Sequence, residues 1–142
     1  MKLNVLRADP AGNITLFVLD PIERERRAAL AAELMHRLPD MKIDQVGFAC
    51  PADADTDGRM EMMGGEFCGN ATMSFGAWLC RRAPIGQTCR LALKISGAPA
   101  LVECSITPLD GCFLGTVDMP LPEIADFLKN QDVDRIEEKL RQ

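Results

Sequence analysis

The stretch from Met60 to Arg82 constrains the fold of this chain most, because signals for three kinds of local structure follow each other closely in it. A short apolar run over Met60–Met63 is followed by Gly64-Gly65, and a helical repeat of apolar residues begins after Cys68. The members of that repeat are Ala71, Phe75, Trp78 and Leu79. This spacing predicts a strand, a tight turn and a buried helix, with Trp78 in the core.

Cys68 is therefore expected immediately before the start of a helix. The free backbone N–H groups and the positive end of the helix dipole at such a place favour the thiolate over the thiol. The glycines on either side let the backbone approach a ligand, and the first N–H groups of the helix can hold a carboxylate. The spacing alone also fits a small cysteine of the core, which is the commoner situation.

Composition excludes several classes of function. The 142 residues suit one domain, and a net charge of −5 with interleaved Lys and Arg offers no basic stripe for nucleic acid. The longest apolar run, near Ile14–Leu19, is too short for a membrane span, and the first residues lack the apolar core of a signal peptide. We therefore expect a cytoplasmic protein without membrane or nucleic-acid partners.

The cysteines and the histidine do not form a metal-binding pattern. The six cysteines contain no Cys-x-x-Cys pair, and the single His36 cannot complete a zinc site. The acidic loop 53–58 begins like a calcium loop, but Gly64 occupies the position where a bidentate Glu is needed. We expect free thiols, a solvated acidic connection and no metal.

The rest of the chain predicts an α+β fold. Strands are expected at 2–7, 14–19 and 45–50, and after the central helix at 88–96, 100–107 and 112–118. A capping box at Asp20-Pro21-Ile22-Glu23 predicts a helix that ends near Leu38, with the charges of residues 23–27 on a solvated face. Alternation in 88–96 indicates a sheet with one face on a core, and Cys89, Cys104 and Cys112 are read as core residues.

The motif GGEFCGNATMSFG resembles the first-cysteine motif of the diaminopimelate epimerase-like superfamily. The likeness is greatest to one branch, the histidine racemases of opine-type metallophore biosynthesis. Three further blocks have counterparts in the same order, namely Pro10–Thr15, Gln45–Phe48 and Lys94–Gly97. The resemblance implies a curved, mostly antiparallel or mixed sheet wrapped around a central helix, which is one half of that fold.

The resemblance covers only a first half. Residues 119–122 look like the family's link between halves, so we expect an epimerase-like domain over 1–122 and a charged helical tail over 123–142. Because the family uses one cysteine from each half, the resemblance implies that the second cysteine comes from a missing half, a partner chain or a homodimer. Cys80 cannot replace it, since twelve residues of helix span about 18 Å.

The family's chemistry implies roles for individual residues. Cys68 matches the first acid/base cysteine of an amino-acid racemase or epimerase that needs neither pyridoxal phosphate nor another cofactor. Asn13, Gln45, Gly69 and Asn70 match substrate contacts, with Gly69 and Asn70 forming the carboxylate cradle.

The specificity remains open at this point. The segment before Cys68, Met62–Gly65, is shorter than in diaminopimelate epimerases proper, which argues for histidine or another simple amino acid. Glu66 would oppose a thiolate if it pointed inward, so we expect it outward or paired. The alternatives are a non-catalytic amino-acid-binding or interaction module, an epimerase-like enzyme of other specificity, and a cysteine hydrolase, which would need His36 beside Cys68.

Overall fold

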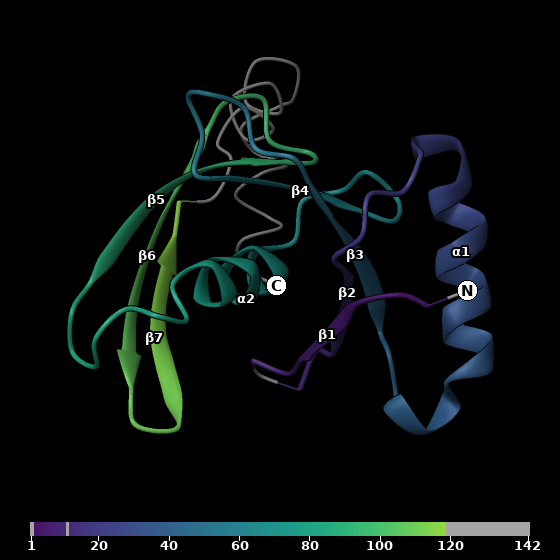
Figure 1. Ribbon diagram of the computed structural model, residues 1–142, viewed down its shortest axis with the longest axis horizontal. Helices are drawn as coiled ribbons and strands as arrows, with labels where there is room; N and C mark the ends of the chain where they lie inside the picture. The colour runs from purple at the N-terminus through teal and green to yellow at the C-terminus, as the bar shows by residue number, and fades with distance from the viewer. Residues whose placement is uncertain (1, 11, 119–142) are drawn as a thin grey trace, which may run out of the picture.

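All strands described by the computed structural model, which covers residues 2–10 and 12–118, belong to one seven-stranded sheet whose strand order follows the chain (Figure 1). The elements are β1 (Val5–Ala8), β2 (Thr15–Val18), α1 (Arg24–Arg37), the 3-10 helix η1 (Pro39–Met41), β3 (Gln45–Cys50), β4 (Gly58–Met62), α2 (Gly69–Leu79), β5 (Cys89–Ile95), β6 (Val102–Leu109) and β7 (Cys112–Val117). The predicted elements are thus present, with ends that differ by a few residues.

The sheet is mixed. β2 pairs with β3 in parallel, and β4 pairs with β5 in parallel, whereas the other four neighbouring pairs are antiparallel. A parallel pair needs a long crossover connection, and the two helices provide these crossovers, α1 between β2 and β3 and α2 between β4 and β5. The expected α+β class and the mixed, mostly antiparallel sheet are confirmed.

The sheet curls so that α2 lies inside the curve and α1 lies outside it, against β3 (Figure 1). Alternate residues of each strand face opposite sides. On β2, Phe17 joins the cluster around α2, while Val18 joins Val46, Phe48 and Ala31 in the cluster under α1. The helix α2 therefore covers the inner face of the sheet, as the sequence predicts for the helix that begins after Cys68.

The packing of α2 on the sheet is close. A Cβ atom added at Gly76 would lie 2.9 Å from the Sγ atom of Cys104 on β6. A side chain at this position would force Cys104 or the helix to shift, and Cys104 is buried, as expected for a core residue. Phe75 is also buried, at 2% exposure. The apolar repeat of this helix therefore does face the core at Ala71 and Phe75.

Two expectations about core residues are wrong. Trp78 is only half-buried, because it lies at the margin of the cluster with the Arg81 guanidinium 4.5 Å above its ring. Cys112 is exposed, because it begins the edge strand β7 on the face that no element of the described residues covers. Cys89 is half-buried against the cluster around α2.

The start of α1 also differs from the prediction. Its N-cap is Glu23, without a side-chain cap bond, and the Asp20 carboxylate instead accepts hydrogen bonds from the backbone and side-chain nitrogens of Asn4. The charges that follow are not all solvated, since the Arg27 side chain is 16% exposed and pairs with Glu61 on β4. The Asp20 carboxylate therefore binds Asn4 and does not cap α1.

The link at 119–122 and the tail at 123–142 lie outside the described residues, so the division of the chain into 1–122 and 123–142 stays a prediction. No helix among the described residues combines the length and apolarity that crossing a bilayer requires.

Candidate active site

Cys68 is the N-cap residue of α2, in extended conformation. Its carbonyl accepts hydrogen bonds from the backbone nitrogen of Thr72 (3.0 Å) and from the Thr72 hydroxyl (2.8 Å). The Cys68 side chain makes no cap bond with the first turn. The Cys68 sulfur therefore makes no hydrogen bond with α2, and its hydrogen-bond partner is a residue of the sheet.

That contact comes from Gln45, the first residue of β3. The Nε2 atom of Gln45 lies 3.1 Å from the Cys68 Sγ atom and 2.8 Å from the Oγ1 atom of Thr15. One amide nitrogen thus donates to both the sulfur and the hydroxyl, so the sulfur is the acceptor. The structure brings together two of the predicted site residues, Cys68 and Gln45, and adds Thr15, which the sequence did not single out.

The register of the sheet explains this arrangement. Thr15 and Gln45 are direct partners in the parallel pair of β2 and β3, and both face α2. Asp44 fixes the register, since its carboxylate accepts from the Ile14 backbone nitrogen (2.7 Å) while the Ile14 carbonyl accepts from the nitrogens of Asp44 and Gln45. The Gln45 side chain therefore lies beside Thr15 because the two strands begin together.

The remaining predicted residues lie close in sequence to these contacts. Gly69 and Asn70 are the first two residues of α2, both half-buried, where the backbone N–H groups of a helix have no carbonyl partner within it. Asn13 is half-buried two residues before Thr15, and no hydrogen bond joins it to Cys68 in the part of the chain that the structure describes. Glu66 is exposed, as expected.

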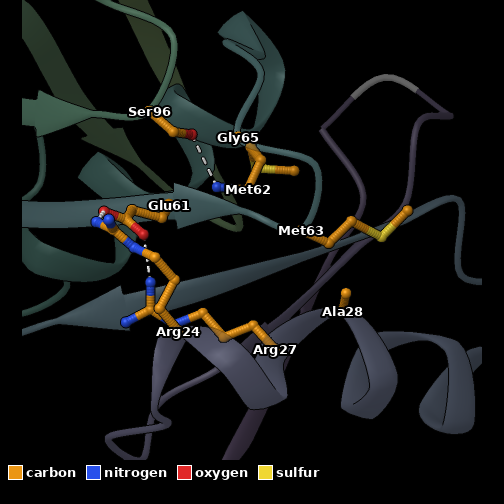
Figure 2. Close-up of a pocket in the computed structure, with 8 residues that line it drawn as sticks. All are labelled: Arg24, Arg27, Ala28, Glu61, Met62, Met63, Gly65 and Ser96. Carbon is orange, nitrogen blue, oxygen red and sulfur yellow. Dashed lines mark hydrogen bonds and ion pairs between the residues drawn. The ribbon is translucent and has the colours of Figure 1, made fainter.

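A turn after β5 fixes the loop that leads to Cys68. The Ser96 hydroxyl accepts from the backbone nitrogen of Met62 (2.8 Å; Figure 2) and donates to the carbonyl of Glu66 (2.7 Å). The next residue, Gly97, has a φ of 77°, and an added Cβ would lie 2.4 Å from the Phe67 nitrogen. Ser96 and Gly97 thus connect β5 to both ends of the loop before Cys68.

The other cysteines lie elsewhere. Cys80 is the C-cap of α2, and Cys104 packs under Gly76. Cys112 is the first residue of β7, and Cys50 lies near the Arg27 guanidinium (Sγ to Nη2, 3.5 Å). Burial, together with a hydrogen bond to Cys89, raises the pKa of Cys80 to about 12, and burial raises that of Cys104 to about 11. At neutral pH both groups therefore remain thiols, and neither supplies a thiolate that could accept a proton.

His36 does not complete a Cys–His pair. It is exposed on α1, and α1 packs on the outer face of the sheet, whereas Gln45 and Cys68 lie on the inner face. A cysteine hydrolase that uses His36 is therefore excluded as a reading of this site.

A cavity of about 390 Å³ lies on the outer side of β4, between the start of α1 and the loop before Cys68 (Figure 2). The carboxylate of Glu61 is bound there by Arg24, Arg27 and Arg59. Burial raises the pKa of Glu61, but hydrogen bonds from Arg59 and Arg24 and the charge of Arg27 outweigh it, and the pKa is lowered. All three guanidinium groups bind the Glu61 carboxylate. Because Arg24 and Arg27 belong to α1 and Glu61 to β4, these ion pairs connect α1 to β4.

The acidic loop 53–58 serves the fold. The Asp57 carboxylate accepts from the Ala92 nitrogen (2.8 Å), and Asp53 lies 3.6 Å from the Lys94 ammonium. Within residues 2–10 and 12–118, no group of three or more His, Cys, Asp or Glu side chains is placed to hold a metal ion.

Sequence reasoning missed two residues around Cys68. Thr15 is the one polar residue in the apolar segment Ile14–Leu19, and it is buried. Because a buried hydroxyl needs a hydrogen-bond partner, its place in the sequence could have indicated a polar contact. Ser96 was within a block that resembles the family, but its partners, 30 and 34 residues away, could not be read from the sequence.

Known proteins resemble this chain over most of its length. The family model described as "Histidine racemase CntK N-terminal domain" matches residues 2–139. A histidine racemase of Staphylococcus aureus is 33% identical over 114 residues, which cover 79% of this chain and 40% of that protein. A histidine racemase of Fusobacterium nucleatum subsp. nucleatum is 28% identical over 142 residues, which cover 97% of this chain and 49% of the relative.

A second Fusobacterium nucleatum histidine racemase is 28% identical over 122 residues, which cover 83% of this chain and 44% of the relative. The chain spans about half the length, or less, of the curated relatives it matches. On the match over residues 2–139 and the similarity to these racemases, the chain belongs to the family of the histidine racemase CntK N-terminal domain.

Proposed function

We propose that this chain is the N-terminal half of a histidine racemase that uses two cysteines and no pyridoxal phosphate, and that its sheet and α2 form one half of a diaminopimelate epimerase-like fold. Family membership and the histidine racemases among its relatives support the reaction class. The chain's share of its relatives' length supports its being a half.

The observation that carries the proposal is the Cys68 sulfur at the start of α2, held as an acceptor by the Gln45 amide. A thiolate there removes the α-proton of the amino acid and becomes a thiol. The electron pair of the broken C–H bond moves into the carboxylate, where the N–H groups of Gly69 and Asn70 stabilise the negative charge. A second thiol on the opposite face then returns a proton to the carbon and becomes a thiolate.

The second thiol is not supplied by the cysteines near this site. Inversion needs an acid across the substrate from Cys68, and the other five cysteines lie on other parts of the fold. Cys50 lies beside Arg27, Cys80 and Cys89 lie beside each other at the end of α2, Cys104 lies under Gly76, and Cys112 begins β7. The opposing cysteine therefore comes from a second half, either in a continuation of the chain or in a partner chain, whereas a homodimer would give inversion by this chain alone. Asn13 and Gln45 then complete the substrate pocket on this side. On this proposal the isolated chain does not racemise, and its cytoplasmic location remains a prediction.

The test is α-proton exchange of L-histidine in heavy water, with chiral analysis of the product. The chain is assayed alone and together with a second half that carries the opposing cysteine. We expect exchange with inversion only in the mixture, reduced by about 10²-fold or more in Cys68→Ser, which is the size of a lost acid/base group. The matched control is Cys112→Ser, an exposed thiol away from the site. Full inversion by the isolated chain would overturn the half-site proposal.

A non-catalytic role of the same site predicts a different result. If the domain only binds an amino acid or a partner, histidine binds to the mixture but its α-proton does not exchange. If another amino acid exchanges faster than histidine under the same conditions, the reaction class stands and the assigned substrate is wrong.

A further inference from the structure

We propose that Thr15 is a positioning residue of the active site: its buried hydroxyl holds the Gln45 amide so that the other N–H of that amide points at the Cys68 sulfur. The inference rests on the proposed role of Cys68 as a proton carrier, and it assigns Gln45 a task besides contact with the substrate.

The geometry defines the chain of contacts. A primary amide nitrogen carries two hydrogens, and in Gln45 one is directed to Thr15 Oγ1 (2.8 Å) and the other to Cys68 Sγ (3.1 Å). The same amide also has an oxygen, which would repel a negatively charged sulfur. Which end of the amide meets Cys68 therefore decides whether the contact supports or opposes a thiolate.

Thr15 is held rigidly enough to determine which end of the Gln45 amide faces Cys68. It is fully buried at 0% exposure on β2, and its backbone is held in register with Gln45 by the bonds between Ile14 and Asp44. A threonine side chain on a strand has few rotamers, so its hydroxyl cannot move to follow the amide. Because Thr15 is fully buried, replacing its hydroxyl with a methyl group removes the acceptor without putting another one in its place, and the Gln45 amide is then free to turn.

The experiment measures the Cys68 thiol itself, not turnover. The rate of alkylation of each cysteine is followed by mass spectrometry as a function of pH in the whole chain. Thr15→Val removes the acceptor but keeps the branched shape, and Thr15→Ser keeps the hydroxyl. We expect Thr15→Val to slow the alkylation of Cys68 by about threefold to tenfold at neutral pH, which corresponds to the free energy of one hydrogen bond.

Thr15→Ser should keep the Cys68 rate within about twofold of the original protein, since its hydroxyl can still accept. The exposed Cys112 in the same samples is the internal control, and its rate should not change. An unchanged Cys68 rate in a folded Thr15→Val protein, or an equal slowing in Thr15→Ser, would overturn the proposal.

A double mutant distinguishes an effect of Thr15 through the Gln45 amide from a general disturbance of the fold. In a Gln45→Ala background, Thr15→Val should cause no further slowing of Cys68, because Thr15 acts through the amide. A full additional effect in that background contradicts the proposal. If Thr15→Val does not fold, Thr15→Ala takes its place, since it also removes the acceptor and should slow Cys68 by a similar factor.

The two proposals fail separately. If these variants slow Cys68 as expected but the assembled halves exchange no α-proton, the contact between Thr15, Gln45 and Cys68 stands and the racemase assignment falls. If the halves racemise normally with Thr15→Val while alkylation is unchanged, the assignment stands and the role of Thr15 falls.

Discussion

Gly97 touches the main chain one residue before Cys68: a Cβ atom on Gly97 would lie 2.4 Å from the Phe67 nitrogen and 2.8 Å from the Glu66 carbonyl carbon. The turn after β5 and the loop after β4 therefore meet backbone to backbone. Any side chain at position 97 must push this loop, and with it the N-terminal end of α2, away from the sheet.

Replacing Gly97 by alanine should therefore lower the free energy of unfolding by about 3 kcal/mol or more, because strain at positive φ and a backbone clash add together. The matched control is Gly86→Ala, which also has a positive φ (85°) but has open space where a Cβ would be. It should cost only about 1–2 kcal/mol. Urea unfolding followed by circular dichroism measures both, and equal losses would show that the contact with Phe67 does not matter.

Cys68 should be the first of the six cysteines to be alkylated near neutral pH. Burial raises the pKa of Cys80, Cys104 and Cys50, so these thiols stay protonated there and react only as the pH rises toward their raised values. Cys112 is the informative competitor because it is exposed without a helix start beside it. Mass spectrometry after short exposure to iodoacetamide gives the order, and earlier labelling of Cys112 or Cys80 would mean that the wrong site has been assigned.

Glu61 should contribute to stability at neutral pH and lose that contribution in acid. Burial raises its pKa, but the Arg59 and Arg24 hydrogen bonds and the Arg27 charge lower it overall from the ordinary 4.5, so the unfolded state binds the proton more readily. The stabilisation is therefore present above pH 4.5 and is lost as the pH falls through the lowered value.

Glu61→Gln should reduce the free energy of unfolding at pH 7 by about 1–3 kcal/mol and flatten its decline in acid. Unfolding curves at pH 7, 5 and 3 provide the measurement. Glu33→Gln is the control, since Glu33 forms an exposed pair with Arg37 within α1 and should change stability by less than about 0.5 kcal/mol. If both variants show the same dependence on pH, the cluster around Glu61 is not a stabilising network.

Phe75→Ala should destabilise the domain more than Trp78→Ala. Phe75 is 2% exposed, with its ring 6.1 Å from that of Phe17 and 6.0 Å from that of Trp78, so its removal leaves a cavity between α2 and β2. We expect a loss of about 3–5 kcal/mol for Phe75→Ala. The half-buried Trp78 should cost less, and a larger loss for Trp78→Ala would contradict the packing described here. Circular dichroism is the suitable signal, because Trp78 is the chain's only tryptophan.

The sequence predicted the elements well and some of their surroundings poorly, for a physical reason. Periodicity depends on which face of an element is covered, and it located α2 and the strands. It could not identify which face of β7 is exposed in the described part of the chain, where Cys112 and Leu114 face out while Phe113 and Val117 face in, because both faces carry apolar residues. Trp78 was misjudged similarly, since a helical stripe gives direction but not the depth of burial.

In the candidate site, too, the local features could be predicted from the sequence and the contacts between distant residues could not. The residues around Cys68 are contiguous, so the turn, the helix start and Gly69 with Asn70 could be predicted locally. The contact between Gln45 and Cys68 spans 23 residues, and that between Gln45 and Thr15 spans 30. Such contacts depend on the parallel register of β2 and β3, which no local pattern in the sequence specifies.

The order of the strands has a consequence for synthesis of the chain. Since every strand pairs with its neighbours in sequence, β1 to β4 can assemble while later residues are still being added. The loop before Cys68 is different, because Ser96 and Gly97, which hold it, come after the helix that it begins. A nascent chain arrested before residue 96 should thus have a formed outer core under α1 and an unplaced Cys68, so the thiol acquires its native surroundings only after β5 has left the ribosome.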